Sequence, residues 1–338
     1  MTALVDVDGL KKYFPINHGF FHSLLREPTR FVKAVDGVSF EIREGEILGL
    51  AGESGCGKST VGELLVRLQM PTDGKIEVGG QNIGTLHQSG IKDFRRHCQI
   101  IFQDPYSSLN PRYTVFQTVV EPVQNYGRLT KSQQISEVYE ALERAELRPA
   151  KNFIGKYPHQ LSGGQRQRIA IARAIVIKPR FIVADEPVSM LDVSIRAGIL
   201  NLLKKLNQEM GLSILYITHD LSTLQYICHR TGIMYLGRIV EIGNTTPLLE
   251  RPFHPYSQAL FAAVPRLDPD YIKPKVRISG EIPSPMNIPQ GCRFWPRCPE
   301  AREICRKTEP VLQPAGPERW VACHVWEKFG KRIDGLKV

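Results

Sequence analysis

Gly52-Glu53-Ser54-Gly55-Cys56-Gly57-Lys58-Ser59-Thr60 is the stretch that decides the fold. Its glycines let the backbone curl until successive N–H groups point inward at phosphate oxygens, and the lysine brings a positive charge to the same place. The run 46–51 before it is largely apolar and predicts a strand buried on both faces, while residues 60–68 after it have helical spacing. Strand, glycine loop and helix in this order predict a phosphate-binding loop.

Each residue type in this loop suits one part of a nucleotide site. Lys58 is expected to reach the β- and γ-phosphates, and the Ser59 hydroxyl to ligate magnesium. The helix that begins near Lys58 adds its positive N-terminal end. The expected phosphate-binding residues are Gly52, Ser54, Gly55, Cys56, Gly57, Lys58, Ser59 and Thr60.

The composition of the 338-residue chain fits one large globular domain with an appendage. Residues 1–8 contain acidic side chains where a signal peptide has a basic and then an apolar run. No window reaches the roughly 18 apolar residues of a membrane-spanning helix. We therefore expect a soluble, cytosolic protein that acts at a membrane only through partners. The net charge of +10 comes from scattered Lys and Arg, without a basic run that indicates nucleic acid.

Phe181-Ile182-Val183-Ala184-Asp185-Glu186 supplies a second part of the site. Four apolar residues predict a central strand, and Asp185 follows at its C-terminal end, where open sheets bind ligands. A carboxylate in that position can hold magnesium through a water. Glu186, one residue on, is placed to polarise an attacking water. Placing two adjacent carboxylates at the end of a buried strand costs free energy of folding, so their presence there favours a functional role.

Periodicity divides the rest of the chain into regions. Short strands are predicted in the first forty residues, at 4–8, 32–35 and 38–42. A helical subdomain is expected at about 105–175, where helix formers dominate. A helix over 194–210 and a strand over 213–218 then continue an α/β core through a right-handed crossover.

Two segments are expected to form loops. Residues 15–29, rich in aromatic and basic side chains, predict a surface loop. Prolines recur after about residue 243, which predicts a loop-rich C-terminal part. We therefore expect a nucleotide-binding domain over 1–245 and a C-terminal extension over 246–338.

Leu161-Ser162-Gly163-Gly164-Gln165-Arg166-Gln167-Arg168 indicates the type of nucleotide site. A serine and two glycines at a helix start form an anion-binding cap, but the loop at 52–60 already covers the phosphates of its own nucleotide. A second cap on the same chain is explained if it serves a nucleotide held by another subunit. The sequence therefore predicts a head-to-tail dimer with ATP between its subunits.

These motifs resemble the ATP-binding cassette (ABC) family over about residues 4–245, and the signature at 161–165 is the most specific of them. The resemblance implies a mixed sheet flanked by helices, an N-terminal antiparallel β subdomain and an inserted helical subdomain. The segment 189–192 resembles the loop that contacts the opposite subunit in the family, although the family usually has Ala where this chain has Met190.

The resemblance also implies further site residues. Tyr13 matches the aromatic that stacks on adenine, with Phe14 as the neighbouring candidate. Gln103 matches the loop glutamine that touches magnesium and the attacking water, and His219 matches the histidine that contacts the γ-phosphate. In a closed dimer the signature residues of one subunit meet the nucleotide of the other: Ser162, Gly163, Gly164 and Gln165. The catalytic set implied is Lys58, Gln103, Glu186 and His219.

Four cysteines near the C-terminus form a second candidate site, with the spacing Cys-x5-Cys-x6-Cys-x17-Cys: Cys292, Cys298, Cys305 and Cys323. In a cytosolic chain such clustering favours a metal site over disulfides. Because the tight Cys-x2-Cys pairs of most zinc sites are absent, zinc, an iron–sulfur cluster and unmetallated thiols all stay open. His324 is an alternative ligand.

Segments 251–260, 280–285 and 291–294 resemble the tail of oligopeptide/dipeptide permease ATPase subunits, and 35–40 resembles the F-type second subunit. This resemblance implies a [4Fe–4S] cluster on the four cysteines, with zinc as the alternative. It also implies an ATPase subunit of a peptide importer on the cytoplasmic face of the inner membrane. The partners would be a sister ATPase subunit, two membrane permeases and, indirectly, an extracytoplasmic solute-binding protein.

The same machinery serves other solutes in related systems, so nickel complexes or oligosaccharides are alternatives to di- and oligopeptides. A soluble cassette ATPase that acts on nucleic acid is a rival of another class. Such proteins commonly carry two cassettes in one chain, whereas this chain has one phosphate-binding loop, so we expect no nucleic-acid partner.

Overall fold

A computed structural model describes residues 2–16, 30–126, 129–263, 278, 280, 281 and 283–330. Its strands are β1 (Ala3–Pro15), β2 (Phe31–Arg43), β3 (Ile47–Ala51), β4 (Asp73–Val78), β5 (Gln81–Asn82), β6 (Cys98–Ile101), β7 (Phe181–Asp185), β8 (Ser213–Thr218), β9 (Arg230–Tyr235), β10 (Arg238–Asn244), β11 (Gln313–Gly316) and β12 (Arg319–Val321). Its helices are α1 (Lys58–Leu65), α2 (Gln88–His97), α3 (Val115–Tyr126), α4 (Lys131–Arg144), α5 (Gly163–Ile175), α6 (Val193–Met210), α7 (Leu224–Ile227), α8 (Thr245–Glu250), α9 (Pro255–Ala263), α10 (Glu303–Lys307) and α11 (Glu327–Gly330).

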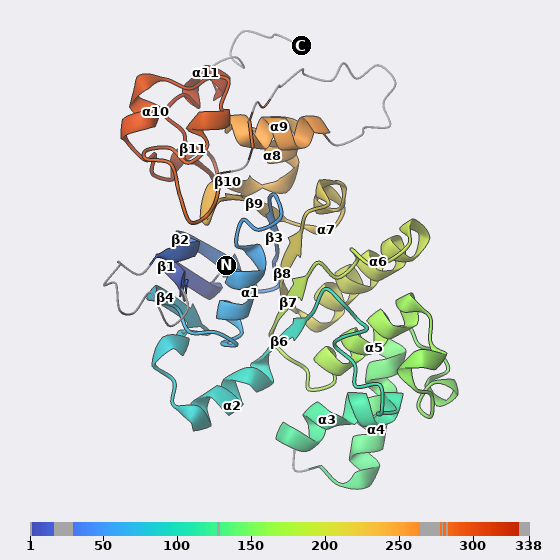
Figure 1. The fold of residues 1–338 in the computed structure, drawn as a ribbon. Coiled ribbons are helices and arrows are strands. Elements are labelled where there is room, and N and C mark those ends of the chain that lie inside the picture. Colours follow the sequence, from blue (N-terminus) through green and yellow to red (C-terminus); the bar gives the residue numbers. More distant parts are fainter. Residues whose placement is uncertain are drawn as a thin grey trace.

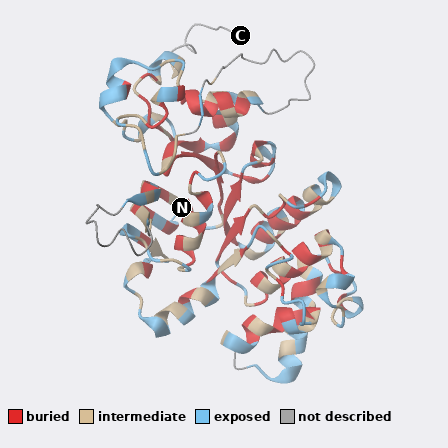
Figure 2. Cartoon of the chain, in the orientation of Figure 1, coloured by how far each residue is buried: buried red, intermediate tan, exposed pale blue. Residues whose placement is uncertain are grey.

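An eight-stranded sheet in the order β11-β12-β10-β9-β3-β8-β7-β6 forms the centre of the molecule (Figure 1). Strands β6, β7, β8, β3 and β9 are mutually parallel, whereas β10, β12 and β11 continue the sheet antiparallel. Every residue of β3, β7 and β8 is buried (Figure 2), as continuous apolar runs require when both faces of a sheet are covered. The structure confirms the α/β class with a mixed sheet.

The N-terminal strands form a separate antiparallel sheet in the order β2-β1-β4-β5. The two strands expected over 32–35 and 38–42 are one continuous strand, because β2 pairs with β1 from Arg43 to Phe31. The expected N-terminal antiparallel β subdomain is therefore present. Most of the loop expected over 15–29 lies outside the described residues.

A helical part, with α3, α4 and α5, lies between β6 and β7 in the chain and to one side of the central sheet (Figure 1). Capping boxes begin two of its helices, at Thr130 before α4 and at Ser162 before α5. Each uses its hydroxyl and a glutamine three residues on to satisfy free backbone N–H groups. Buried aliphatic residues such as Val138, Leu142 and Ile169 hold the helices together.

The C-terminal part has more regular structure than its proline content predicts. β12 pairs with β10, with Glu241 opposite Val321, so residues after 245 add two strands to the central sheet. The Glu241 carboxylate is completely buried and accepts hydrogen bonds from the backbone N–H groups of Phe253 and His254 at 2.8 and 3.0 Å. Arg319 pairs with the same carboxylate at 2.5 Å. These contacts fasten the extension to the core.

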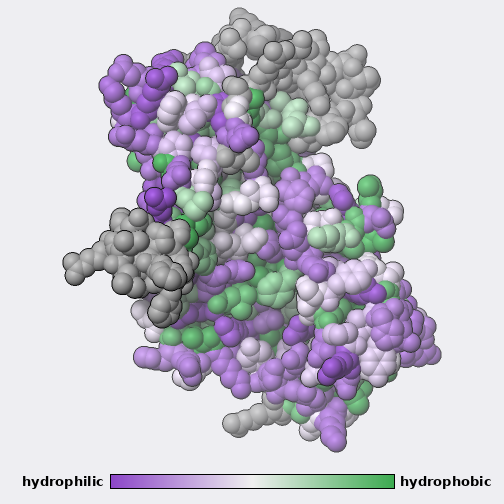
Figure 3. All heavy atoms as spheres, viewed as in Figure 1, coloured by the Kyte–Doolittle hydropathy of each residue, from purple (hydrophilic) through white to green (hydrophobic). Residues whose placement is uncertain are grey.

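The surface shows where polar and apolar side chains gather. In the view of Figure 3, the C-terminal part is mostly hydrophilic, and apolar atoms gather near the middle of the face. Among the described residues, no helix is both long and apolar enough to cross a lipid bilayer.

Candidate functional site

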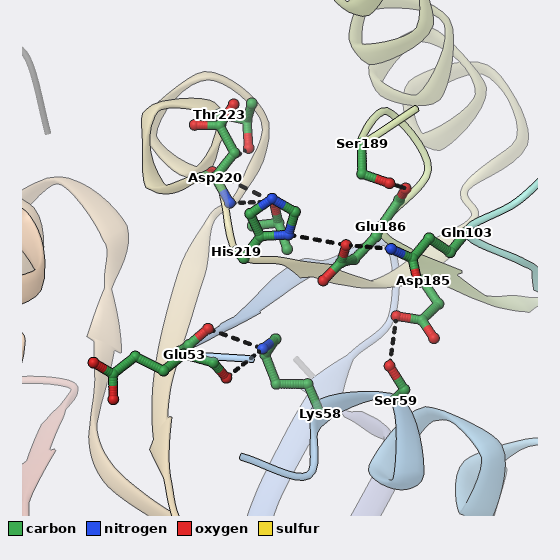
Figure 4. Close-up of polar contacts among 12 residues, drawn as sticks. Glu53, Lys58, Ser59, Gln103, Asp185, Glu186, Ser189, His219, Asp220 and Thr223 are labelled. Carbon is green, nitrogen blue, oxygen red and sulfur yellow. Dashed lines mark hydrogen bonds and ion pairs between the residues drawn. The ribbon is translucent and has the colours of Figure 1, made fainter. Parts of the chain in front are cut away.

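The glycine loop connects β3 to α1, as the sequence predicts. Gly57 caps α1 at φ 103°, and a Cβ there would lie 2.1 Å from the backbone oxygen of Ala34, so only glycine fits. Lys58 is the first residue of the helix and is buried. Its Nζ donates hydrogen bonds to the carbonyl oxygens of Gly52 and Glu53 at 2.9 and 3.0 Å (Figure 4).

Ser59 and Asp185 bring two oxygens together from neighbouring elements. Ser59 Oγ donates a hydrogen bond to Asp185 Oδ1 at 3.1 Å (Figure 4). Burial, with a smaller contribution from the charge of Glu186, raises the pKa of Asp185 to about 6. A hydroxyl and a carboxylate are hard oxygen donors, so this pair fits a cation such as Mg²⁺.

Glu186 is the centre of a hydrogen-bonded cluster. Its Oε2 accepts a hydrogen bond from Gln103 Nε2 at 2.8 Å and lies 2.9 Å from His219 Nδ1 (Figure 4). The three residues follow β6, β7 and β8, whose carboxyl ends meet at one edge of the sheet because the strands are parallel neighbours. Glu186 has a positive φ of 45°, an uncommon backbone conformation for a non-glycine residue.

These residues surround one cavity of about 380 Å³. The lining residues are Ala34, Ser54, Gly55, Gly57, Lys58, Ser59, Thr60, Gln103, Glu186 and His219. Ala34 is the one member that the sequence did not single out. Gly52 and Cys56 of the glycine loop and Asp185 at the end of β7 do not line the cavity, and the side chain of Cys56 is buried. The structure therefore brings the expected phosphate-binding and catalytic side chains to a single place.

The signature residues lie elsewhere. Ser162 is exposed at the start of α5, where its hydroxyl accepts the backbone N–H of Gln165 at 3.3 Å. A Cβ on Gly164 would lie 2.6 Å from Ile195, so glycine allows α5 to approach α6. Neither these residues nor Gly163 line the cavity. Nearby, Met190 is 62% exposed, in the loop expected to meet another subunit.

Tyr13 lies in β1 opposite Lys33, two residues before the end of the strand, and does not line the cavity. Its hydroxyl hydrogen-bonds the Asp36 carboxylate, and burial raises the pKa of Tyr13 to about 12. Asp36 pairs in turn with Arg293, which comes from the C-terminal part. Sequence reasoning missed Asp36 and Arg293. The sequence signal for Arg293 was its position directly after Cys292, within the C-terminal cysteine segment.

The four C-terminal cysteines gather in one neighbourhood as free thiols. Burial raises the pKa of Cys292 and Cys298 to about 11, and the negative charge of neighbouring thiolates, Cys305 included, adds to this. Burial raises the pKa of Cys323 to about 12, and all three other cysteines contribute. The backbone N–H of Cys292 donates to the carbonyl of Cys305 at 2.8 Å.

A sulfur-only donor set fits iron–sulfur or zinc chemistry. However, within the described part of the chain, no group of three or more His, Cys, Asp or Glu side chains is arranged to hold a metal ion. The structure therefore gathers the donors without completing a metal site. Nε2 of His324 lies 2.9 Å from the carbonyl oxygen of Thr308.

Comparison with known proteins gives the family. Residues 35–189 match the ABC transporter family. The chain belongs to the ABC transporter family. Residues 240–305 match the C-terminal region of oligopeptide/dipeptide transporters.

Individual relatives extend over almost the whole chain. The chain is 45% identical to the oligopeptide transport ATP-binding protein AppF of Bacillus subtilis over 327 residues, which are 96% of this chain and 98% of AppF. It is 45% identical over 323 residues to the dipeptide transport ATP-binding protein DppF of Haemophilus influenzae, covering 95% and 96% of the two chains. Among solved structures, the dimeric post-hydrolysis cassette MJ0796 bound to ADP and phosphate matches with a TM-score of 0.62 and 29% identity, over 71% of this chain and 98% of that one.

Proposed function

We propose that this ABC protein is the ATP-hydrolysing subunit of a peptide importer. The cluster of Gln103, Glu186 and His219 beside Lys58 carries the proposal, because it places a carboxylate at the end of a phosphate-binding cavity. The names of relatives at 45% identity, oligopeptide and dipeptide transport ATP-binding proteins, support ATP as the nucleotide and peptides as the cargo. Nickel complexes or oligosaccharides are the alternative cargo.

In the proposed reaction, Lys58 and the loop amides bind the phosphates and Tyr13 holds the base. Glu186 orients a water for in-line attack on the γ-phosphorus and accepts its proton, while His219 and Lys58 stabilise the charge that develops on the transferred group. Ser59, Asp185 and Gln103 would hold Mg²⁺, which supplies neutralising charge to the phosphate oxygens. These roles assign the catalysis to residues 1–245, with a helical subdomain at about 105–175.

We propose that a second ATPase subunit completes the site. Ser162, Gly163, Gly164 and Gln165 lie at the start of α5, away from the cavity of their own chain. Ser162 is exposed there and Gly163 and Gln165 are partly exposed, which suits contact with a nucleotide on another chain. Exposed apolar side chains in the adjoining segment, Met190 at 62% and Val193 at 80%, support an interface there. The F-type resemblance favours a sister subunit over a second copy.

Two membrane permeases are the proposed output partners, which would place the protein on the cytoplasmic face of the inner membrane. A groove of about 230 Å³ lies where α2 and β6 meet α3 and α5, and it contains the partly exposed Phe102 beside Gln103. A permease segment in this groove would sense the loop that carries Gln103. An extracytoplasmic solute-binding protein would act only through the permeases. We propose no nucleic-acid partner.

We propose that the C-terminal extension, residues 246–338, carries a [4Fe–4S] cluster on its four cysteines, with zinc as the alternative: Cys292, Cys298, Cys305 and Cys323. The gathering of the four thiols supports it, because the other three all lie close enough to raise the pKa of Cys323. We assign this cluster a structural or regulatory role, because the four cysteines do not line the phosphate-binding cavity. Metal analysis and visible absorbance after anaerobic purification test the proposal; a metal-free protein with normal stability would contradict it.

Replacement of Glu186 tests the ATPase assignment. Glu186→Gln should lower the hydrolysis rate by about 10²- to 10⁴-fold, because the amide cannot accept the proton of water. ATP binding should remain, since the phosphate-binding loop is unchanged. The matched control is Glu303→Gln, which removes an exposed carboxylate of the C-terminal part. Equal rates in wild type and Glu186→Gln would disprove the role of this carboxylate.

A further inference from the structure

The C-terminal part holds one residue of the phosphate-binding loop at two points. Arg297 donates two hydrogen bonds to the Glu53 carboxylate, from Nη1 to Oε2 at 2.9 Å and from Nη2 to Oε1 at 3.1 Å. Tyr256 Oη accepts the backbone N–H of Glu53 at 2.9 Å. Arg297 and Tyr256 lie more than 200 residues further along the chain. Both contacts therefore join the C-terminal extension to the loop.

Glu53 also faces the catalytic lysine. Its carbonyl oxygen accepts a hydrogen bond from Lys58 Nζ at 3.0 Å. Figure 4 shows the Glu53 carboxylate pointing away from Lys58 while the backbone of Glu53 lies beside the lysine amine. The C-terminal part thus holds the side chain and the N–H of Glu53, while the carbonyl of Glu53 holds Lys58, which lines the cavity.

The groups that hold Glu53 are themselves rigid. Arg297 is 8% exposed, and its guanidinium lies 5.8 Å from the ring centre of Tyr235 and 5.9 Å from that of Phe294. Tyr256 is completely buried, with its ring centre 4.6 Å from that of Tyr235 and 5.4 Å from that of Phe294. A planar guanidinium that binds a carboxylate through two parallel hydrogen bonds fixes orientation as well as distance.

We propose that Arg297 and Tyr256 are positioning residues for ATP binding: they set the backbone at Glu53, and through it the place of Lys58. This inference rests on the proposed function. It assigns the C-terminal extension a direct influence on nucleotide affinity. The extension has other attachments, such as the pairing of β12 with β10 and the buried Arg319–Glu241 pair, so loss of Arg297 alone should leave it docked.

The test measures ATP affinity in the full-length chain. Arg297→Met keeps a long, flexible apolar side chain at this buried position and removes the two hydrogen bonds to Glu53. The dissociation constant and the KM for ATP should rise about tenfold, within the range usual for coupled sites, and kcat should change less than about twofold. Tyr256→Phe should raise the same two constants, because the N–H of Glu53 loses its acceptor.

Controls separate positioning from general stability. Lys307→Met breaks the exposed Lys307–Glu303 pair in α10, an ion pair in the same region that does not contact the loop, and should leave ATP affinity unchanged. Glu53→Gln combined with Arg297→Met should weaken ATP binding no more than one replacement alone, since both act through a single contact. Partial recovery in Arg297→Lys would support the same contact.

The outcomes distinguish this inference from the proposed function. If Arg297→Met lowers the melting temperature but leaves the ATP dissociation constant unchanged, the contact only fastens the extension and the inference is wrong. Additive losses of ATP affinity in the variant that combines Glu53→Gln with Arg297→Met would also show that the inference is wrong. If the wild-type chain itself fails to bind ATP, the proposed function fails, whatever the variants do.

Discussion

His254 should make the stability of this protein sensitive to mild acid. The residue is 1% exposed, and its ring packs against the rings of Tyr256 and Phe294. Nδ1 accepts the backbone N–H of Tyr256 at 3.0 Å, which requires an unprotonated nitrogen in the folded state. Burial lowers the pKa of His254 from 6.5 to about 3.

The direction and size of the effect follow from this difference. Below pH 6.5 the unfolded chain binds a proton at His254 that the folded chain does not bind, so the free energy of unfolding falls as the pH is lowered. The slope is about 1.4 kcal/mol per pH unit until the pH approaches the folded pKa of His254. Between pH 7.5 and pH 5 this residue should therefore remove about 2 kcal/mol of stability.

Urea unfolding at pH 7.5, 6 and 5 measures this loss, in wild type and in His254→Asn. Asparagine cannot gain a charge, and its side-chain oxygen can replace Nδ1 as the acceptor. The variant should start less stable at pH 7.5 and lose about 2 kcal/mol less than wild type on going to pH 5. His87→Asn, at an exposed position, is the control and should follow wild type. Parallel pH profiles for wild type and His254→Asn would refute the reasoning.

Three further predictions concern the site and the attachment of the extension. His219→Ala should lower kcat by about 10²-fold in a phosphate-release assay, because Glu186 loses a polar neighbour; an unchanged rate would remove His219 from the catalytic set. Gly57→Ala should abolish ATP binding measured by calorimetry, because the added Cβ would lie 2.1 Å from a backbone oxygen of β2; normal affinity would contradict this. Arg319→Met should destabilise the protein by about 3–5 kcal/mol in urea, because the buried Glu241 carboxylate loses its charged partner; a loss below 1 kcal/mol would show that the backbone donors suffice.

Part of the cavity could be anticipated from the sequence, because the glycine loop and the pair Asp185–Glu186 each follow a buried strand. A run of apolar residues marks such a strand, and the next residues must then lie at the carboxyl edge of a parallel sheet. This reasoning located Asp185 and Glu186, whereas Gln103 and His219 came from the resemblance to the ABC family. The side chains of Gln103, Glu186 and His219 meet at that edge. Their roles in catalysis stay predictions until they are tested by mutation.

Long-range contacts could not be anticipated in the same way. Arg297 and Glu53 are separated by 244 positions, and no periodic pattern relates a single arginine to a single glutamate. The strands β11 and β12 have four and three residues, which is too short for alternation to stand out from chance. Both features depend on how the extension packs against the finished core.

The position of the signature shows why one chain is only part of the proposed site. Ser162 and Gln165 satisfy each other's free backbone groups at the start of α5, so folding alone does not require an anion there. Ser162 is exposed at this helix start, which lies outside the cavity that contains Lys58. Because the cap of α5 is complete without an anion and the motif does not line the cavity of its own chain, we infer that it contacts the nucleotide of another subunit.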